Sequence, residues 1–219
     1  MDAYQNGPLT LGIVARMLGI SVVDVVTGWP SSAPKLFVSQ GTTNDRQSSA
    51  QLLERPEAAY VVDAATIAEL TLIGGQRALS VLPKLYCSTK TLEVLEACLE
   101  KALAIGESGS LLDDEGKMRF IEYSSREKEQ RVAFLQQMVE ATRAHCEVVS
   151  AYGPVNLPDG LESAEKTLEA EEYSALLLVA ERDATLLTVD GRLAQLTAAI
   201  LQRPWVWPQV LLMHAVRNV

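Results

Sequence analysis

The fold is decided by residues 169–193, EAEEYSALLLVAERDATLLTVDGRL. Apolar residues at helical spacing fill its first half, and a short run of threonine, leucine and valine follows before Gly191. These patterns predict a helix over 169–182, a strand over 184–189 and a helix over 191–201. A strand between two helices is typical of βαβ units, which place their strands in a parallel sheet.

The same alternation extends upstream from residue 58. A strand is predicted just before Asp63, and the helix that follows it ends at Gly74 and Gly75. We predict strands at 60–62, 85–88 and 147–152, and helices at 89–101 and 126–144. We therefore expect an α/β fold in which a central parallel sheet lies between helices, an α/β/α sandwich with right-handed crossovers.

Two additions to this sandwich are predicted. Residues 1–57 are expected to form an N-terminal extension that packs on a main domain spanning 58–219, and strand-like runs around Gly116 predict a β-hairpin insertion at about 108–124. Within the extension we predict helices at 10–18, 21–29 and 45–53, and a strand at 35–40. The first two helices also have the outline of a helix-turn-helix, but residues 21–29 lack basic or amide side chains to read base edges, which favours an ordinary helical pair.

Composition restricts the function further. The 219 residues are 48% hydrophobic, enough for a core, and the net charge of −9 opposes general adhesion to nucleic-acid phosphates. The odd number of cysteines, at Cys87, Cys98 and Cys146, favours a reducing, cytoplasmic location, and no secretion signal or membrane span is predicted.

Acidic residues stand at the ends of the predicted strands. Asp63 ends the strand at 60–62 and Asp190 ends the strand at 184–189, while Glu172 and Glu93 lie near the starts of the helices at 169–182 and 89–101. Ligands of an open parallel sheet bind at the carboxyl ends of its strands, so we expect these four carboxylates to share one edge.

A shared divalent cation would explain such a group, because carboxylates packed together without one repel each other. Oxygen ligands without nearby His or Cys favour Mg²⁺ or Mn²⁺, which supports phosphodiester hydrolysis. Each acid also has a structural explanation on its own: Glu172 favours a helix N-terminus, and Asp63 and Asp190 can cap helices.

The segments YVVDAATIAELTLIG, STKTLEVLE and EEYSALLLVAERDATLLTVDGRL resemble the PIN domain, a metal-dependent ribonuclease fold. The resemblance covers roughly residues 58–217. It implies that Asp63, Glu93, Glu172 and Asp190 are the catalytic and metal-binding residues, with Glu96 as an alternative to Glu93. Thr188 and Arg192 are flanking matches, and Val189 stands where many PIN domains have a second Asp.

The whole chain also resembles the C-terminal part of large bacterial proteins of the TPR/GreAB-C-PIN type. That resemblance implies a longer polypeptide or multi-component system, while the resemblance to the PIN domain implies single-stranded RNA as substrate and a homodimer. Arg192, Thr188 and Ser174 are the candidates for substrate contacts and water positioning, and Trp205 and Trp207 either stack on bases or pack in the core. The alternative function is a catalytically silent PIN-like interaction module.

Overall fold

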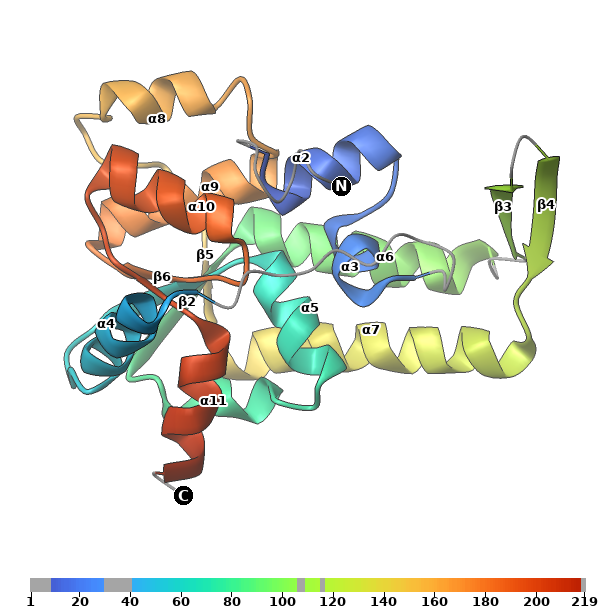
Figure 1. Cartoon of the computed structure of the whole chain (residues 1–219), viewed down its shortest axis with the longest axis horizontal. Coiled ribbons are helices and arrows are strands. Elements are labelled where there is room, and N and C mark those ends of the chain that lie inside the picture. Colours follow the sequence, from blue (N-terminus) through green and yellow to red (C-terminus); the bar gives the residue numbers. More distant parts are fainter. Residues whose placement is uncertain (1–8, 30–40, 106–108, 115–116, 218–219) are drawn as a thin grey trace.

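The computed structural model describes residues 9–29, 41–105, 109–114 and 117–217, so the strand predicted at 35–40 lies outside the described residues. Its centre is one parallel sheet of five strands (Figure 1). Their order across the sheet is β5 (Glu147–Val149), β2 (Lys84–Ser88), β1 (Ala59–Val62), β6 (Thr185–Leu187) and β7 (Trp205–Val206). The predicted parallel sheet is therefore confirmed.

Helices cover both faces of the sheet, because successive side chains of a strand point to opposite sides. On the central strand, Tyr60 and Val62 pack with α5 (Ala64–Leu72) and α7 (Ser125–His145). Val61, between them, packs with α9 (Ala170–Arg182) on the other face. All three of these strand residues are fully buried, and the result is the expected α/β/α sandwich.

The remaining elements of the sandwich include the two helices predicted at 89–101 and 191–201, and others that the sequence patterns did not predict. They are η1 (Gln76–Val81), α6 (Thr89–Ile105), α8 (Asp159–Ala164), α10 (Gly191–Leu196), η2 (Thr197–Leu201) and α11 (Pro208–Arg217). Helix α8 lies between the strand predicted at 147–152 and the helix predicted at 169–182, where no element was predicted. Pro158 precedes its first turn, two acids favour its N-terminal dipole and Leu161 is fully buried, so tertiary packing stabilises a short helix that the Pro and Gly residues obscured.

The N-terminal extension contributes α2 (Leu11–Leu18), α3 (Val22–Thr27) and α4 (Thr43–Leu53). Thr10 and Ser21 cap the first two helices through their side-chain oxygens, and Gly19 ends α2 in the left-handed conformation. A partly buried ion pair between Asp24 of α3 and Arg131 of α7 fastens α3 to the main body. Helices α2 and α3 pack on each other, and α3 also packs on α5 of the main domain.

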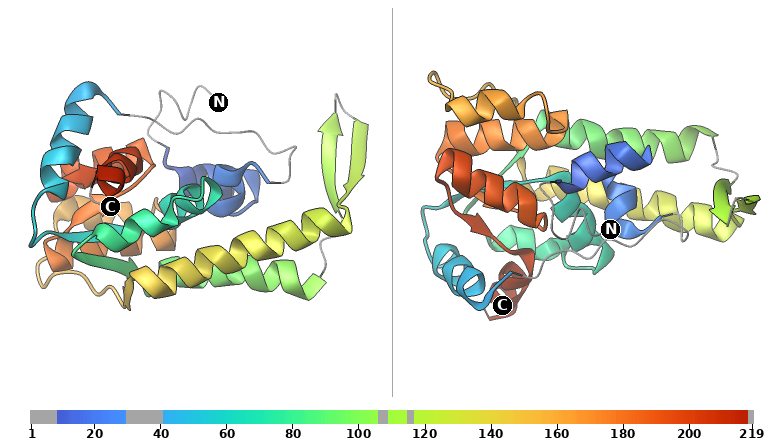
Figure 2. Two further views of the ribbon diagram at one scale, coloured as in Figure 1. Left: turned by 90° about the horizontal axis from the view of Figure 1, so that it is seen from below. Right: turned by 45° about the horizontal axis from the view of Figure 1, so that its top comes forward.

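The predicted hairpin is formed by β3 (Gly109–Asp114) and β4 (Lys117–Glu122). It stands at the end of the α6 and α7 pair that lies away from the sheet (Figure 2). Since helix α6 starts at the carboxyl end of β2 and runs away from it, the hairpin does not reach the edge where the strand-end acids lie. No helix in the described ranges is long and apolar enough to cross a membrane.

Candidate functional site

Asp63 and Asp190 lie side by side at one edge of the sheet. Strands β1 and β6 are parallel neighbours, with Val62 opposite Leu187, and each aspartate follows the carboxyl end of its strand. Each is also the N-cap of the next helix: Asp63 accepts a hydrogen bond from the amide of Thr66, and Asp190 accepts from the amide of Leu193. These two aspartates therefore share one edge of the sheet, and each also caps a helix, which was its alternative explanation.

Two threonines tie these strand ends together. The hydroxyl of Thr188 donates to the carboxylate of Asp63 and accepts a hydrogen bond from the amide of Asp190 at 3.0 Å. The hydroxyl of Thr66 accepts from the amide of Val189 at 2.9 Å. Both threonines are fully buried, so the two aspartates are held in fixed positions relative to each other.

Glu171, in the first turn of α9, is a further acid near Asp63. Its Oε1 accepts a hydrogen bond from the amide of Ala64 at 2.7 Å and another from the hydroxyl of Thr91 at 3.1 Å. Thr91 lies in the first turn of α6 and also contacts Ser88 at the end of β2. Glu171 therefore connects the carboxyl ends of β1 and β2.

Glu172, the next residue, points to the other side of the same site. Its carboxylate accepts hydrogen bonds from the hydroxyl of Thr10 at 2.9 Å, the amide of Gly12 at 2.8 Å and the amide of Glu169 at 3.2 Å. Two of these donors belong to the N-terminal end of α2. The same helix reaches Asp190, whose Oδ2 accepts from the amide of Leu11 at 2.5 Å.

The four carboxylates form one electrostatic unit, which we call the acid cluster (Asp63, Glu171, Glu172 and Asp190). All are at most 5% exposed. The hydrogen bonds described above come from backbone amides and threonine hydroxyls, with no basic side chain among those donors. The amides lie at the N-termini of four helices (α2, α5, α9 and α10), where the partial positive charge of the helix favours anions.

Burial raises the pKa of every member of the acid cluster. The pKa of Glu171 rises to about 8, first because of burial and then because of the charges of Asp63 and Glu172. Burial and the charge of Asp190 raise the pKa of Glu172 to about 7, and burial raises that of Asp190 to about 6. Burial also raises the pKa of Asp63, although its hydrogen bonds oppose the shift. Perturbed groups of this kind are typical of functional sites.

Glu93 does not lie with the other predicted acids. Its carboxylate forms an ion pair with Lys90 at 2.7 Å on the surface, where 58% of its side chain is exposed. Helix α6 turns by about 100° per residue, so burying Thr91 at the sheet edge directs the residue two positions later outward. Glu96 pairs with Arg143 and does not replace it. Glu171 supplies the acid in their place, and the adjacent pair of glutamates was the only sequence signal for it.

The other predicted side chains differ in how they relate to the acid cluster. Thr188 belongs to the acid cluster's hydrogen-bond network, as described above. Ser174 is buried on α9, and within the described residues it makes no hydrogen bond to the acids. Arg192 follows Asp190 in the first turn of α10, where its guanidinium contacts the side chain of Gln195 at 2.6 Å. Trp207 is 3% exposed and packs in the core, so packing is the explanation that holds for it.

Comparison with known proteins finds a matching family. The family described as "PIN domain associated with the TPR-GreAB-C-PIN system" matches residues 61–199, which is more than half of the chain. The chain belongs to the PIN-domain family. PIN domains are generally nucleases that use divalent metal ions. No curated protein matches the chain. Among solved structures, PAE2754 from Pyrobaculum aerophilum is similar, with 17% identity and a TM-score of 0.44 over 73% of this chain and 90% of that chain.

The acid cluster of this PIN domain fits a divalent ion in chemistry but not in its present arrangement. Carboxylate oxygens are the ligands that Mg²⁺ and Mn²⁺ prefer. Yet within the part of the chain that the structure describes, no three His, Cys, Asp or Glu side chains are arranged to hold a metal ion. Asp63, Glu172 and Asp190 each direct both carboxylate oxygens at the protein's own donors.

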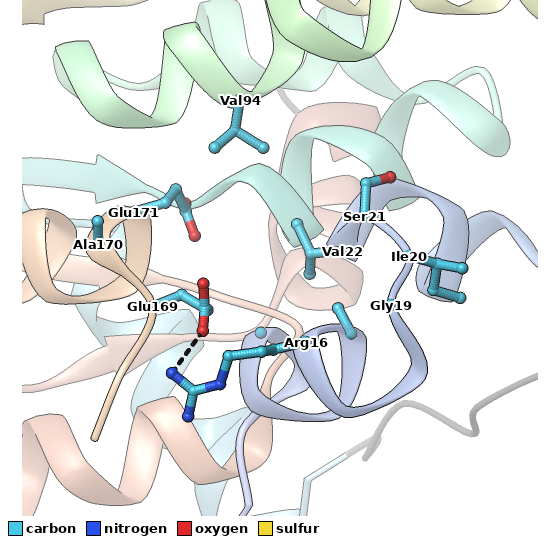
Figure 3. A pocket seen from close by; sticks show the side chains of 11 residues that line it. Arg16, Gly19, Ile20, Ser21, Val22, Val94, Glu169, Ala170 and Glu171 are labelled. Carbon is cyan, nitrogen blue, oxygen red and sulfur yellow. Dashed lines mark ion pairs between the residues drawn. The ribbon is translucent and has the colours of Figure 1, made fainter. Parts of the chain in front are cut away.

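A cavity of about 430 Å³ borders the acid cluster. Glu171 points into it from α9, and Val94 of α6 lies on the opposite wall (Figure 3). Helix α2 forms the third wall through Gly12, Ala15 and other residues, while Arg16 pairs with Glu169 at its rim at 2.9 Å. Because only Oε1 of Glu171 is bound by Ala64 and Thr91, this cavity is the approach to the acids that the PIN domain leaves open.

Proposed function

We propose that this PIN domain is a Mg²⁺- or Mn²⁺-dependent endoribonuclease whose metal is held by the acid cluster. The observation that supports the proposal most strongly is the convergence of four buried carboxylates from three separate segments at the carboxyl edge of a parallel sheet. Such an ion, when bound, supplies water activation and charge stabilisation for phosphodiester hydrolysis. Asp63, Glu171, Glu172 and Asp190 are the residues proposed to hold it.

The surrounding side chains have positioning roles in this proposal. Thr188 fixes Asp63 relative to Asp190, and Thr91 fixes Glu171 relative to the end of β2. Arg192, next to Asp190 in the first turn of α10, is the cation placed to contact a substrate phosphate. Single-stranded RNA is the proposed substrate because of the family, and the net charge of −9 requires that the contact be local.

The family description also suggests a setting for the enzyme. It names a TPR-GreAB-C-PIN system, so we propose that this PIN domain acts within a multi-component assembly or a longer polypeptide. Tetratricopeptide repeats bind other proteins in extended grooves, which would bring the nuclease to its target. We also propose that the protein forms a homodimer.

A catalytically silent interaction module is the second candidate. One observation favours it: the acid cluster is satisfied by amides and hydroxyls of the protein itself, including those of α2, and so is stable without a cation. Val189 instead of a second aspartate beside Asp190 points in the same direction. The two candidates differ in whether the acids exchange these donors for a metal ion.

Cleavage and metal binding separate the two candidates. The full chain is incubated with labelled single-stranded RNA or DNA in Mg²⁺, Mn²⁺ or EDTA, beside Asp63→Asn and Asp190→Asn, and Mn²⁺ binding is measured by titration calorimetry. The nuclease predicts RNA cleavage that EDTA and both substitutions abolish. RNA binding without cleavage, and without Mn²⁺ binding by any variant, would establish the silent module instead.

A further inference from the structure

The N-terminal end of α2 occupies the acid cluster. Three consecutive residues (residues 10–12, called the blocking segment below) donate to it: the hydroxyl of Thr10 and the amide of Gly12 to Glu172, and the amide of Leu11 to Asp190. We propose that the blocking segment is an autoinhibitory contact that must leave before the acid cluster binds a divalent cation and RNA. This inference rests on the proposed nuclease function.

The blocking segment, like a cation, binds and stabilises the negatively charged carboxylate oxygens. Free amides at a helix N-terminus carry a partial positive charge of about half a unit, and they bind anions through directed N–H groups. Here the two amides and the hydroxyl bind three of the four oxygens of Glu172 and Asp190. A divalent cation seeking the same oxygens competes with the blocking segment, and the two cannot bind these lone pairs together.

The packing of α2 against Glu172 also leaves no space for an ion. A Cβ atom added at Gly12 would lie 2.5 Å from the carboxylate carbon of Glu172, closer than real Cβ atoms approach. Glu172 has little room to swing aside, because it is buried and held by Glu169 on its other side. The helix and the carboxylate therefore touch directly, with no room for an ion or a water between them.

Two features of α2 favour its separation from the site, an open side and a glycine hinge. The 430 Å³ cavity lies between α2 and α6, so the helix is not packed against that neighbour, and Met17 at its far end is 71% exposed. Gly19 follows in the left-handed conformation with no atoms near its Cβ position. Helix α3 stays fixed by Asp24 and Arg131, so rotation at Gly19 moves α2 alone.

Release is opposed by the burial of apolar side chains of α2 and by the polar contacts of Arg16. Leu11 and Ile13 are buried in the two core clusters, and Arg16 pairs with Glu169 and donates to the carbonyl of Thr167. The equilibrium between the docked and released helix reduces the apparent cation affinity by the fraction of molecules that are released. Weakening the docked state should therefore raise cation affinity without any change in the acids.

The test uses the full chain with Thr10→Ala and Gly12→Ala combined. The first change removes one donor to Glu172, and the second places a Cβ atom against its carboxylate. A matched control combines Thr42→Ala, which removes the capping side chain of α4, with Gly160→Ala at the second position of α8, where the nearest atom is the side chain of Ile200 at 3.1 Å. Mn²⁺ affinity is measured by calorimetry and RNA cleavage in parallel.

We expect the combined α2 variant to bind Mn²⁺ about tenfold or more tightly than the unmodified chain, and to cleave RNA faster, while the control pair stays at the unmodified level. If the unmodified chain, the α2 variant and the control pair bind Mn²⁺ equally tightly, and Asp190→Asn abolishes this binding, the autoinhibitory contact is overturned and the nuclease proposal stands. No Mn²⁺ binding by any of them would overturn both.

A second measurement needs no variant and so does not depend on how well the substitutions fold. Hydrogen exchange of the Leu11 and Gly12 amides in the unmodified chain is followed while Mn²⁺ is added. The inference expects their protection to fall as the ion binds, while the α3 amides stay protected. Unchanged or increased protection at Leu11 and Gly12 in the Mn²⁺-bound protein would overturn it.

Discussion

The backbone amide of Leu11 donates a hydrogen bond of 2.5 Å to Oδ2 of Asp190, a residue 179 positions later in the sequence. This contact joins the first described helix of the chain to the end of a central strand. It satisfies one carboxylate oxygen of an aspartate that is 1% exposed, and it favours the charged form of that side chain. The stability and chemistry of the acid cluster therefore depend on a segment outside the matched PIN region at residues 61–199.

Stability should fall as pH rises when no divalent cation is present. A carboxyl group with a higher pKa in the folded state stabilises the protein fully below its unfolded pKa, and that contribution is lost as pH rises through the folded pKa. For Glu171 the window runs from its ordinary value of 4.5 to about 8, and for Asp190 from 3.8 to about 6. We expect the free energy of unfolding to be lower at pH 8 than at pH 5 by on the order of 1 kcal/mol or more.

Urea unfolding at the two pH values measures this effect. Glu171→Gln removes a carboxyl group whose pKa is raised from 4.5 to about 8, so it should flatten the pH dependence and raise stability at pH 8. Glu93→Gln, at an exposed position, should leave the pH dependence unchanged. A chain that is equally stable at both pH values, or more stable at pH 8, would show that the acids are not held as described.

Thr188→Val should weaken both stability and any cleavage. The substitution keeps the shape of the side chain but leaves a carboxylate oxygen of Asp63 and the amide of Asp190 without their buried partner. Leaving such groups unsatisfied costs about 1 to 3 kcal/mol. Chemical denaturation checks the prediction against Thr142→Val, a buried threonine of α7 whose hydroxyl only donates to Met138 within its own helix. A loss no larger than that of the control would argue against the bridging role of Thr188.

Arg131→Met should destabilise the chain by about 3 kcal/mol, because it leaves Asp24 partly buried without its cation. The double variant Asp24→Asn with Arg131→Met should recover a large part of this loss, since no unpaired charge remains. Thermal unfolding of the single and double variants measures the difference. If the double variant is as unstable as the single one, then packing of Arg131 between Trp29 and Phe134, and not its charge pair, fastens α3.

Sequence patterns predicted most of the fold because each strand and helix carries its own periodicity. The parallel sheet, the hairpin, the helix at 10–18 and the helix over 169–182 were all visible locally. Helix α8 was missed because its six residues depend on burial of Leu161, which no local pattern reports. Strand β6 is shorter than predicted, because its pairing with β1 ends at Leu187 and residues 188–190 turn into the cap of α10.

The site was only partly predictable for a related reason. Asp63 and Asp190 follow directly from strand ends, whose common edge is fixed by topology. Glu93 was chosen by spacing, but burial of Thr91 sets the phase of α6 and turns Glu93 to solvent. Glu171 and Glu172 are adjacent in sequence, and their separate partners become visible only in three dimensions, as does the contact from Leu11.

The most direct test of the carboxylate site compares Glu171→Gln with Glu93→Gln in metal-dependent cleavage of labelled single-stranded RNA. Both changes remove one negative charge, and both are made in the unmodified chain and in the Thr10→Ala, Gly12→Ala background. The account predicts that Glu171→Gln lowers the rate by about a hundredfold or more, whereas Glu93→Gln stays within about twofold of its parent. Cleavage that survives Glu171→Gln and is lost in Glu93→Gln would contradict it.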